Sequence, residues 1–378
     1  MPHAVVVGGG IGGLSTAVGL HRIGWRVTVL EQASAFAEIG AGITLWPNAL
    51  RALEALGLHA QVRDLGAPQR SGGMRTGTGR WLLHMDGESL ARRLGRPMLG
   101  VHRASLHTAL LEALPPDALH AGVRIGELTE DGTVPGLDLP PADLVVGADG
   151  INSRIRAQYW PDHPGPSYSG ITSWRAICRR DEHTEIATSW CMGREFGIVP
   201  LVDGRIYWYG AMPAPEGARD ADEHAFVREH FAWHSPIPEL IDATPAADVL
   251  RHDIRYLRTP LGSYVHGNVA LLGDAAHAMT PHLGQGGCQA LEDAAVLVAA
   301  CARFGTVTEA LRHYDAERRP RSQQIARASY WSGRLGPQLV NPFAVALRNA
   351  GMRLIPQRAV ARNLTRVCSW TPPRITLP

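Results

Sequence analysis

The sequence has no lysine, so arginine supplies all 37 of its strongly basic residues. Schiff-base chemistry needs an ε-amino group, and its absence excludes enzymes that work through a lysine imine. Cysteine is also scarce, since its five residues are widely spaced and form no Cys-x-x-Cys pair. This pattern favours reduced thiols in a cytoplasmic protein over a disulfide framework.

Charge and hydropathy exclude two further classes of partner. The arginines are balanced by 35 acidic residues, and the formal net charge of +2 comes without a basic stripe. Nucleic-acid binding is therefore not expected. The longest apolar stretch, residues 294–302, is about half of the roughly 18 residues that a spanning helix needs. No membrane span is predicted, and the N-terminus lacks the pattern of a signal peptide.

The size and composition indicate a globular protein with a large core. The chain has 378 residues, of which 45% are apolar and 19% charged. Such a length exceeds what one hydrophobic core usually covers, so two domains or one elaborated unit are expected.

A strand, a glycine-rich turn, a helix and a second strand open the chain. Gly8, Gly10 and Gly13 occupy the first, third and sixth positions of a dinucleotide fingerprint. Glu31, followed by Gln32, closes the second strand, where an acidic residue can bind ribose hydroxyls. The turn and the following helix N-terminus predict a pyrophosphate site, which either FAD or NAD would fit.

Two later motifs follow short apolar runs that are typical of buried parallel strands. The first covers residues 147–156, and the second covers residues 272–287. Asp274 comes directly after its strand and can accept hydrogen bonds from ribose or ribityl hydroxyls. Gly284, Gly286 and Gly287 precede an apolar helix, whose N-terminus favours a negative charge.

Composition divides the chain into interleaved segments. Aromatic and β-branched runs between residues 167 and 261 predict a mixed or antiparallel sheet. We therefore expect a dinucleotide-binding domain built from segments 1–65, 101–160 and 266–330. Segments 66–100 and 161–265 are expected to form a second domain, and residues 331–378 a helical tail.

Together with the fingerprint and Arg103, the two later motifs resemble the class A flavoprotein monooxygenases. These are single-component FAD enzymes with the para-hydroxybenzoate hydroxylase fold, and the resemblance covers nearly the whole chain. It implies an α/β protein with a Rossmann-type FAD-binding domain, an inserted mixed β-sheet substrate domain and a C-terminal helical segment. It also implies a monooxygenase that consumes NADH or NADPH and O2 and hydroxylates an aromatic or polycyclic small molecule through a flavin hydroperoxide.

The resemblance assigns most of the cofactor contacts. Pro281 is expected to pack near the flavin ring, Asp274 to bind the FAD chain and Arg103 to lie near the pyrophosphate. Thr44 and Ile125 are transferred from the family in the same way. The complete set of expected FAD contacts is Gly8, Gly10, Gly13, Glu31, Gln32, Thr44, Arg103, Ile125, Asp274, Pro281, Gly284, Gly286 and Gly287.

The substrate site is predicted from a strand near the middle of the chain. Its period of two places Tyr207 and Tyr209 on one face and Trp208 on the other. The stretch is similar to the FAD-dependent urate hydroxylases, in which the tyrosine that matches Tyr207 helps to activate the substrate. Those enzymes carry a substrate-binding arginine where this chain has Glu195, so urate is disfavoured as its substrate.

We predict Tyr207 and His282 as the acid–base residues, since both side chains can exchange a proton with a phenolic substrate. Trp46, Glu195 and Tyr209 are the other residues expected in the substrate pocket. A core position for Trp46, a surface position for Glu195 and a loop-stabilising role for His282 stay open as alternatives.

Several alternatives to an aromatic hydroxylase are considered. Epoxidation or Baeyer–Villiger insertion stays open, because the resemblance to zeaxanthin-epoxidase-like sequences is comparable, and so does a non-catalytic flavin-binding protein. A flavin halogenase would need a catalytic lysine. His230 and His234 are one helical turn apart without a third ligand, so no metal site is predicted. The arginine-rich stretch 348–366 is interpreted as a helix that docks on the FAD-binding domain rather than on lipid.

Overall fold

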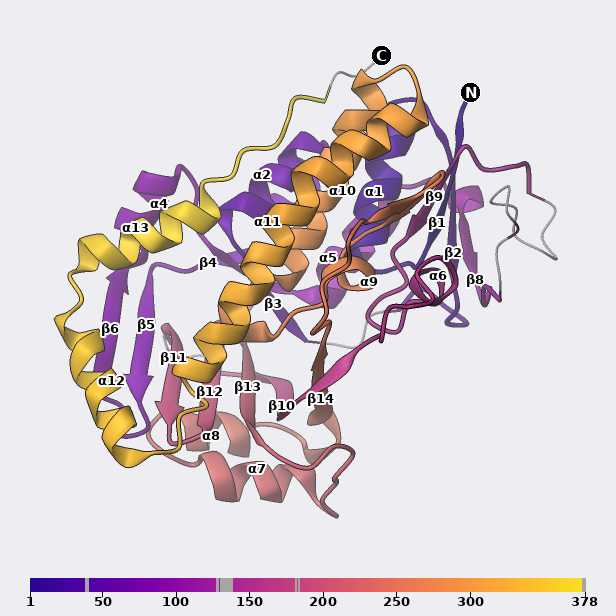
Figure 1. Ribbon diagram of the computed structural model, residues 1–378. Helices are drawn as coiled ribbons and strands as arrows, with labels where there is room; N and C mark the ends of the chain where they lie inside the picture. Colours follow the sequence, from indigo (N-terminus) through magenta and orange to yellow (C-terminus); the bar gives the residue numbers. More distant parts are fainter. Residues whose placement is uncertain (38–40, 127–128, 130–138, 181, 183, 376–378) are drawn as a thin grey trace.

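The computed structural model describes residues 1–37, 41–126, 129, 139–180, 182 and 184–375 and contains three sheets with helices around them (Figure 1). The first sheet has six strands in the order β15-β16-β9-β1-β2-β8. These strands are β1 (His3–Val7), β2 (Arg26–Glu31), β8 (Leu119–Ala121), β9 (Leu144–Gly147), β15 (Val265–His266) and β16 (Val269–Leu271).

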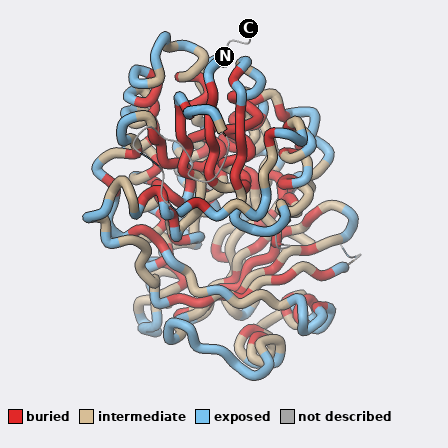
Figure 2. Tube along the Cα trace, turned by 90° about the vertical axis from the view of Figure 1, so that its right-hand side faces the viewer, coloured by how far each residue is buried: buried red, intermediate tan, exposed pale blue. Residues whose placement is uncertain are grey.

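The central strands of this sheet consist of small and β-branched residues because they lie in the interior of the protein. β1, β9 and β16 are buried at every position, as Figure 2 shows for the strands of this sheet. They are parallel to one another and to β2. The helix α1 (Ile11–Arg22) follows β1 and packs against α5 (Arg103–Glu112) and α10 (Gly286–Arg303). This is the Rossmann-type arrangement predicted from the sequence.

The strand register brings three sequence motifs to one edge of the sheet. Gly147 at the end of β9 pairs with Val7 of β1 on one side and with Leu271 of β16 on the other. The turns that follow these three strands are therefore neighbours at the carboxyl edge, where ligands of open α/β sheets bind.

The second sheet is mixed and has seven strands in the order β14-β10-β13-β12-β11-β5-β6. Its pairs are antiparallel except for β5 with β11. Its strands are β5 (Ser71–Thr76), β6 (Trp81–Asp86), β10 (Ser167–Arg179), β11 (Ile186–Cys191), β12 (Arg194–Pro200), β13 (Arg205–Pro213) and β14 (Leu250–Tyr256).

Alternation along these strands separates a core face from a second face. On the core face, Phe196 stacks on Trp208 with ring centroids 5.4 Å apart. These rings pack with residues of α7 (Glu223–Phe231) and α8 (Ile237–Asp242) into a core of their own. Tyr207 and Tyr209 alternate with Trp208 and point to the opposite face, as the period of two predicts.

A third sheet connects segments that are far apart in the sequence. It has the order β3-β7-β4, formed by β3 (Gly42–Leu45), β7 (Leu99–His102) and β4 (Gly66–Pro68). The region 66–100 is therefore shared between two sheets, because β5 and β6 join the seven-stranded sheet. The division of the chain into two domains with the expected boundaries stays a prediction.

The remaining helices lie around these sheets, and the C-terminal region is helical (Figure 1). α11 (Val307–Leu335) packs against α10, α12 (Pro342–Leu354) against β6, and α13 (Gln357–Cys368) against α2 and α4. No helix in the described residues combines the length and the hydropathy that crossing a membrane requires. The other helices are α2 (Pro47–Ala55), α3 (His59–Arg63), α4 (Gly87–Leu94), α6 (Arg154–Tyr159) and α9 (Asp274–His277), with 3-10 helices η1 (Pro116–Ala118), η2 (Ala246–Asp248) and η3 (Pro281–Leu283).

Candidate active site

The fingerprint turn after β1 has the close packing that its glycines predict. Gly8 has a φ of +111°, and a Cβ built on it would lie 2.3 Å from the carbonyl oxygen of Ala148. A Cβ on Gly13 would lie 2.1 Å from the carbonyl oxygen of Gly8. Gly10 differs, because a Cβ there would meet no described atom within 4 Å. The structure therefore packs Gly8 and Gly13 against protein and leaves open space beside Gly10, where a pyrophosphate would approach.

Glu31 lies at this turn with its carboxylate close to the glycines. Its Oε2 accepts a hydrogen bond from the backbone N–H of Gly9 at 2.8 Å, and its Oε1 accepts one from Ala33 at 2.8 Å. The neighbouring Gln32 is exposed. The carboxylate thus fixes the turn in addition to standing where ribose hydroxyls are expected.

The side chains of the motif at residues 147–156 make hydrogen bonds to other parts of the protein. Asp149 accepts hydrogen bonds from the backbone N–H groups of Arg154 at 2.7 Å and Ile155 at 3.2 Å. Arg156 donates to the carbonyl oxygens of Ala275 at 2.9 Å and Ile151 at 2.7 Å. The motif therefore connects α6 to the turn that carries Asp274.

Asp274 and the glycine loop present exposed groups at the carboxyl edge of the first sheet. Asp274 begins α9 directly after β16, and its side chain is exposed. Pro281 and Gly284 are exposed as well, and a Cβ on Gly286 would meet no described atom within 4 Å. Gly286 begins the 18-residue helix α10, so the positive end of a long helix faces this space.

The remaining expected cofactor contacts are Thr44, Arg103 and Ile125. The loop is close to β3, since a Cβ on Gly287 would lie 2.7 Å from Cδ1 of Ile43, the neighbour of Thr44. Arg103 begins α5, and its backbone N–H donates to the carbonyl oxygen of Ala41 at 2.9 Å. Ile125 is 5% exposed within the core of the first sheet, so it offers little side-chain surface to a cofactor.

These groups fit FAD. Open backbone at a strand–helix turn suits a pyrophosphate, and a free aspartate one strand away suits polyol hydroxyls. The N-terminus of α10 suits the pyrimidine end of a flavin, which carries negative charge after reduction.

A buried cluster of charges, absent from the sequence-based prediction, holds these segments in place. Glu292 of α10 accepts hydrogen bonds from Arg318 at 2.6 Å and from Asn48 at 2.7 Å. Arg321 donates twice to the same carboxylate, at 2.6 and 2.7 Å. Asn48 lies two residues after Trp46, so Glu292 connects the β3–α2 turn to α11. All of these links join residues more than 20 positions apart.

The face of the second sheet that carries Tyr207 and Tyr209 points toward β3. We call this surface, with Arg175 and Glu195 on the neighbouring strands, the tyrosine face. Arg175 lies directly across from Tyr209 in the sheet register. A Cβ on Gly42 of β3 would lie 2.3 Å from Cγ of Tyr207, so only glycine leaves room for this ring. The two tyrosine rings are 6.0 Å apart.

Both tyrosine hydroxyls are held in the protonated form. Burial raises the pKa of Tyr207, although the guanidinium groups of Arg175 and Arg103 act in the opposite direction. Burial and then the negative charge of Glu195 raise the pKa of Tyr209 well above its ordinary value. At neutral pH the two side chains are therefore hydrogen-bond donors rather than bases.

Glu195 and His282 form a buried pair beside these tyrosines. Nδ1 of His282 lies 3.2 Å from Oε1 of Glu195, and the two side chains are 4% and 6% exposed. Nε2 of His282 lies 3.1 Å from the side-chain nitrogen of Gln338. The structure thus brings together two residues that are 87 positions apart. Glu195 is buried, so it does not occupy the surface position that the sequence left open.

Several N–H groups around this site have no acceptor within the described chain. They are Nε1 of Trp46, Nε1 of Trp190 and Nε of Arg175, and all three are buried. Nε1 of Trp46 lies 3.2 Å from the position of a Cβ on Gly284, beside the glycine loop. Since buried donors are normally paired, these groups indicate a ligand that carries acceptor oxygens.

Sequence reasoning did not find Arg175 or Gln338. The signal for Arg175 was an arginine inside a predicted strand of aromatic and β-branched residues. Gln338 lies after the end of α11, and nothing in its local sequence indicates a contact with His282.

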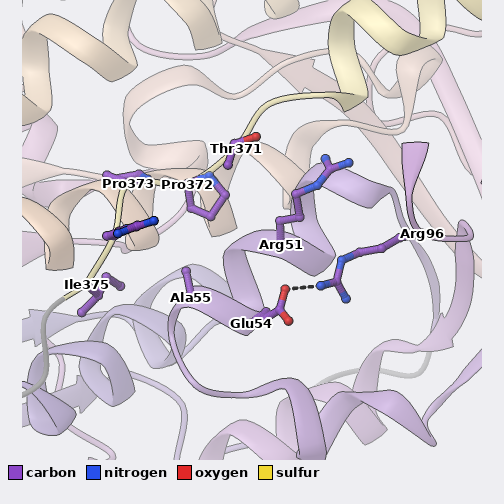
Figure 3. Close-up of a pocket in the computed structure, with 9 residues that line it drawn as sticks. Arg51, Glu54, Ala55, Arg96, Thr371, Pro372, Pro373 and Ile375 are labelled. Atoms are coloured by element: carbon purple, nitrogen blue, oxygen red, sulfur yellow. Dashed lines mark hydrogen bonds and ion pairs between the residues drawn. The ribbon is translucent and has the colours of Figure 1, made fainter. Parts of the chain in front are cut away.

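Two other places do not belong to this site. A surface groove of about 570 Å³ lies between α2 and the segment after α13, and it contains the Glu54–Arg96 ion pair (Figure 3). None of the predicted site residues lines this groove. His230 and His234 bond to the carbonyl oxygen of Phe226 and to the hydroxyl of Ser189, both at 2.9 Å, and the described residues contain no group of metal-ligating side chains.

The comparisons with known proteins agree with this geometry. Residues 2–329 match the family described as "FAD binding domain", and the chain belongs to this family. It is 38% identical to an aurachin C monooxygenase/isomerase of Stigmatella aurantiaca, over 97% of this chain and 98% of the relative. It is 34% identical to a 2-heptyl-3-hydroxy-4(1H)-quinolone synthase of Pseudomonas aeruginosa, over 95% of both chains.

A solved structure of Klebsiella pneumoniae HpxO, complexed with FAD and uric acid, superimposes with a TM-score of 0.89 and 28% identity over 97% of this chain and 96% of that chain. The protein is an FAD-dependent monooxygenase with the fold predicted from its sequence. Enzymes of this class typically take their electrons from NAD(P)H.

Proposed function

We propose that this enzyme oxygenates a neutral, nitrogen-containing bicyclic aromatic compound with a ring carbonyl, of the 4-quinolone type. The observation that carries the proposal is the buried Glu195–His282 pair, 3.2 Å apart, on the tyrosine face. The proposal includes O2 as co-substrate and a cytoplasmic location, which the five free cysteines support.

A buried carboxylate selects against anions and for N–H donors. A second negative charge within a few ångströms of Glu195 would be strongly unfavourable where little water screens it. A ring N–H, in contrast, supplies the hydrogen bond that the carboxylate accepts. Neutral heteroaromatic rings with an N–H group therefore fit better than urate or benzoate anions.

The ring carbonyl of the substrate would meet hydrogen-bond donors. The hydroxyls of Tyr207 and Tyr209 stay protonated, and Nε of Arg175 and Nε1 of Trp46 are buried without an acceptor in the described chain. A ring carbonyl offers two lone pairs to such groups. A 4(1H)-quinolone carries an N–H donor and a carbonyl acceptor on one ring, so it can bond both to the carboxylate of Glu195 and to these donors.

His282 is proposed as the residue that moves a proton. FAD supplies the electrons and the activated oxygen when it is bound. Oxygen insertion at a ring carbon requires a proton to leave that ring, and Nε2 of His282 would take it in place of its contact with Gln338. Glu195 would stabilise the positive charge that His282 then carries, as a buried carboxylate does in catalytic triads. Before this step, Gln338 would fix the orientation of the imidazole ring.

The relatives support this substrate class. The Pseudomonas aeruginosa relative is a 2-heptyl-3-hydroxy-4(1H)-quinolone synthase. The Stigmatella aurantiaca relative is named a monooxygenase and isomerase. An epoxidation followed by rearrangement is therefore the second candidate, and a proton-transferring pair such as Glu195–His282 suits that reaction as well.

The test uses the FAD-loaded enzyme and two kinds of probe. 4(1H)-Quinolone and its 2-heptyl derivative represent neutral substrates, and urate and para-hydroxybenzoate represent anions. We expect the neutral probes to accelerate NAD(P)H oxidation at least about tenfold and to yield a product with one added oxygen. Nuclear magnetic resonance of the product separates ring hydroxylation from epoxidation with rearrangement. Faster turnover with the anions would overturn the proposal.

A pair of variants tests the role of the carboxylate. Glu195→Gln keeps the size of the side chain but removes its charge, and we expect kcat/KM for the quinolones to fall about 10- to 100-fold. Glu229→Gln changes an exposed glutamate of α7 and serves as the matched control. Equal kinetics of the two variants would contradict a substrate contact by Glu195.

A further inference from the structure

The exposed apolar side chains are concentrated in one part of the chain. Among the described residues, seven of the nine exposed large apolar side chains fall between positions 331 and 355. Isolated exposed apolar residues are normal in soluble proteins, but a cluster of this kind marks a binding surface. We call it the apolar face, and it consists of Trp331, Leu335, Val340, Phe343, Leu347, Leu354 and Ile355.

The helix α12 shows that this face lacks a partner. Phe343, Leu347 and Leu354 follow helical spacing on one side of the helix, and they are 87%, 76% and 82% exposed. Val345 and Met352 lie on the opposite side, where the helix packs against β6. A helix that is apolar on both sides normally has both sides covered. The inner side of α12 is covered by β6, and its outer side is open.

The same region is strongly basic. Residues 327–378 contain eight arginines and no aspartate or glutamate. Arg358, Arg362 and Arg366 are exposed and four residues apart, so they form a stripe along α13. The other side of α13 packs against α2 and α4, which agrees with the docking helix predicted from the sequence. Of the acidic residues at the end of β6 and in α4, Asp86 caps α4 and Glu88 lies in the first turn of that helix.

We propose that α12 and α13 dock the enzyme on the surface of an anionic phospholipid bilayer. Figure 1 shows the two helices following one another along the same side of the molecule. Apolar side chains of α12 would enter the boundary between headgroups and acyl chains, and arginines of α13 would bind the phosphate groups. α12 has 13 residues, too few to cross a bilayer, so the contact lies in the interface.

Charge favours a bilayer over a second copy of the chain. A two-fold dimer through this face would bring the arginines of both copies together. No acidic residue in 327–378 would compensate them. Anionic headgroups, in contrast, neutralise each arginine that reaches them.

The apolar face also borders the candidate active site. The loop between α11 and α12 contains Gln338, whose side-chain nitrogen lies 3.1 Å from His282. Arg348 of α12 donates to the carbonyl oxygen of Gly336 in the same loop at 2.5 Å. For a substrate with an alkyl chain, docking here would bring the substrate from the lipid to the site by a short path. This step rests on the proposed function. The docking itself is independent of the substrate.

Co-sedimentation with lipid vesicles tests the proposal on the full-length, FAD-loaded enzyme. The vesicles contain phosphatidylglycerol and phosphatidylcholine in a ratio of about 1:2, and pure phosphatidylcholine vesicles serve as the uncharged reference. We expect binding to the anionic vesicles that weakens at least about fivefold between about 0.1 M and about 0.5 M salt. The pure phosphatidylcholine vesicles should retain little protein.

Two sets of variants separate the apolar and the electrostatic parts. The triple variant Phe343→Ser, Leu347→Ser and Leu354→Ser changes only exposed side chains and should reduce vesicle binding at least about tenfold. Arg358→Gln with Arg362→Gln should weaken binding to anionic vesicles only. Arg26→Gln with Arg303→Gln removes the same charge from exposed positions elsewhere and should leave binding unchanged.

Three results would overturn the proposal. The first is a wild-type enzyme that does not bind anionic vesicles at low salt. The second is equal binding by the wild type and the triple serine variant. The third is a wild-type dimer in sedimentation velocity that the triple variant converts to a monomer, since the apolar face would then join two copies. Circular dichroism and the FAD spectrum confirm that each variant is folded, and loss of turnover without loss of vesicle binding would affect only the proposed function.

Discussion

Nε of Arg318 donates a hydrogen bond to Oδ1 of Asp293 at 2.7 Å, and neither side chain has exposed surface. The other oxygen of Asp293 accepts a hydrogen bond from the backbone N–H of Gly273 at 3.0 Å and lies 2.5 Å from Nε2 of His277. Gly273 directly precedes Asp274, the expected FAD contact. One buried ion pair therefore fixes the turn that presents Asp274 and links it to α10 and α11.

Breaking this pair should destabilise the whole protein. Arg318→Met leaves the carboxylate of Asp293 buried without its arginine and removes one of the two arginines at Glu292, and we expect a loss of about 3–5 kcal/mol in the free energy of unfolding. Urea denaturation followed by circular dichroism measures this loss. Arg327→Gln, on the exposed side of the same helix, should change the stability by less than about 0.5 kcal/mol. A small effect of Arg318→Met would show that the network is not needed for the fold.

The Arg318–Asp293 pair makes the stability of the protein depend on pH in the acidic range. Burial alone would raise the pKa of Asp293, but His277 and Arg318 outweigh it and lower the pKa to about 2. A carboxylate with a lowered folded pKa stabilises the protein above its unfolded pKa of about 3.9, and this stability is lost as the pH falls toward about 2. The shift corresponds to about 2–3 kcal/mol.

We therefore expect the wild type to lose stability more steeply than Asp293→Asn between about pH 5 and pH 3, although the variant is less stable at neutral pH. Urea midpoints measured across this range give the two slopes. Parallel slopes would mean that Asp293 does not titrate as its surroundings imply.

Two glycines of the fingerprint should respond differently to the same change. A Cβ on Gly13 would lie 2.1 Å from the carbonyl oxygen of Gly8, whereas a Cβ on Gly10 would meet no described atom within 4 Å. We expect Gly13→Ala to destabilise the fold by about 3 kcal/mol or more. Gly10→Ala should keep the stability within about 1 kcal/mol but weaken FAD binding at least about tenfold, because the added methyl group occupies space for the pyrophosphate.

Thermal unfolding of the apoprotein and fluorescence titration with FAD measure these two effects separately. A Gly10→Ala variant that binds FAD like the wild type would place the pyrophosphate elsewhere.

The parts of this structure that were predicted correctly follow from local patterns in the sequence. The fingerprint turn and the two later motifs each stand between a buried strand and a helix, so short stretches of sequence were enough to recognise them. The alternation of Tyr207, Trp208 and Tyr209 is local in the same sense, and it placed the two tyrosines on one face and Trp208 on the other. The structure then shows that the face of Trp208 is the core face. Parallel pairing then brought the motifs to one edge, which follows from the fold class alone.

Long-range pairing accounts for what the sequence did not predict. Glu195 of β12 meets His282 of the 3-10 helix η3, and Arg318 of α11 reaches Asp293 of α10. No periodicity or motif encodes such contacts, since each residue alone looks like an ordinary polar position. The burial of Ile125 is a third example, because a family-based transfer cannot show how much of a side chain the core covers.

The assignment of Tyr207 and His282 leads to the last prediction. Tyr207→Phe removes a hydroxyl that burial keeps protonated, so we expect kcat for oxygenation to fall about 10- to 100-fold with little change in FAD binding. His282→Ala should lower kcat by a similar or larger factor, because it removes the group proposed to take the proton. Tyr330→Phe, which changes a tyrosine that stacks on Tyr256, is the control.

The pH dependence distinguishes a donor from a base at Tyr207. If its hydroxyl donates a hydrogen bond and stays protonated, the ratio of wild-type to Tyr207→Phe rates is constant between about pH 6 and pH 9, since the pKa is raised above the ordinary value of about 10. A ratio that changes tenfold across this range would mean that Tyr207 ionises there and acts as a base. Normal oxygenation rates in both Tyr207→Phe and His282→Ala, with FAD reduced at the usual rate, would remove these two residues from the mechanism and leave Glu195 as the polar group to examine next.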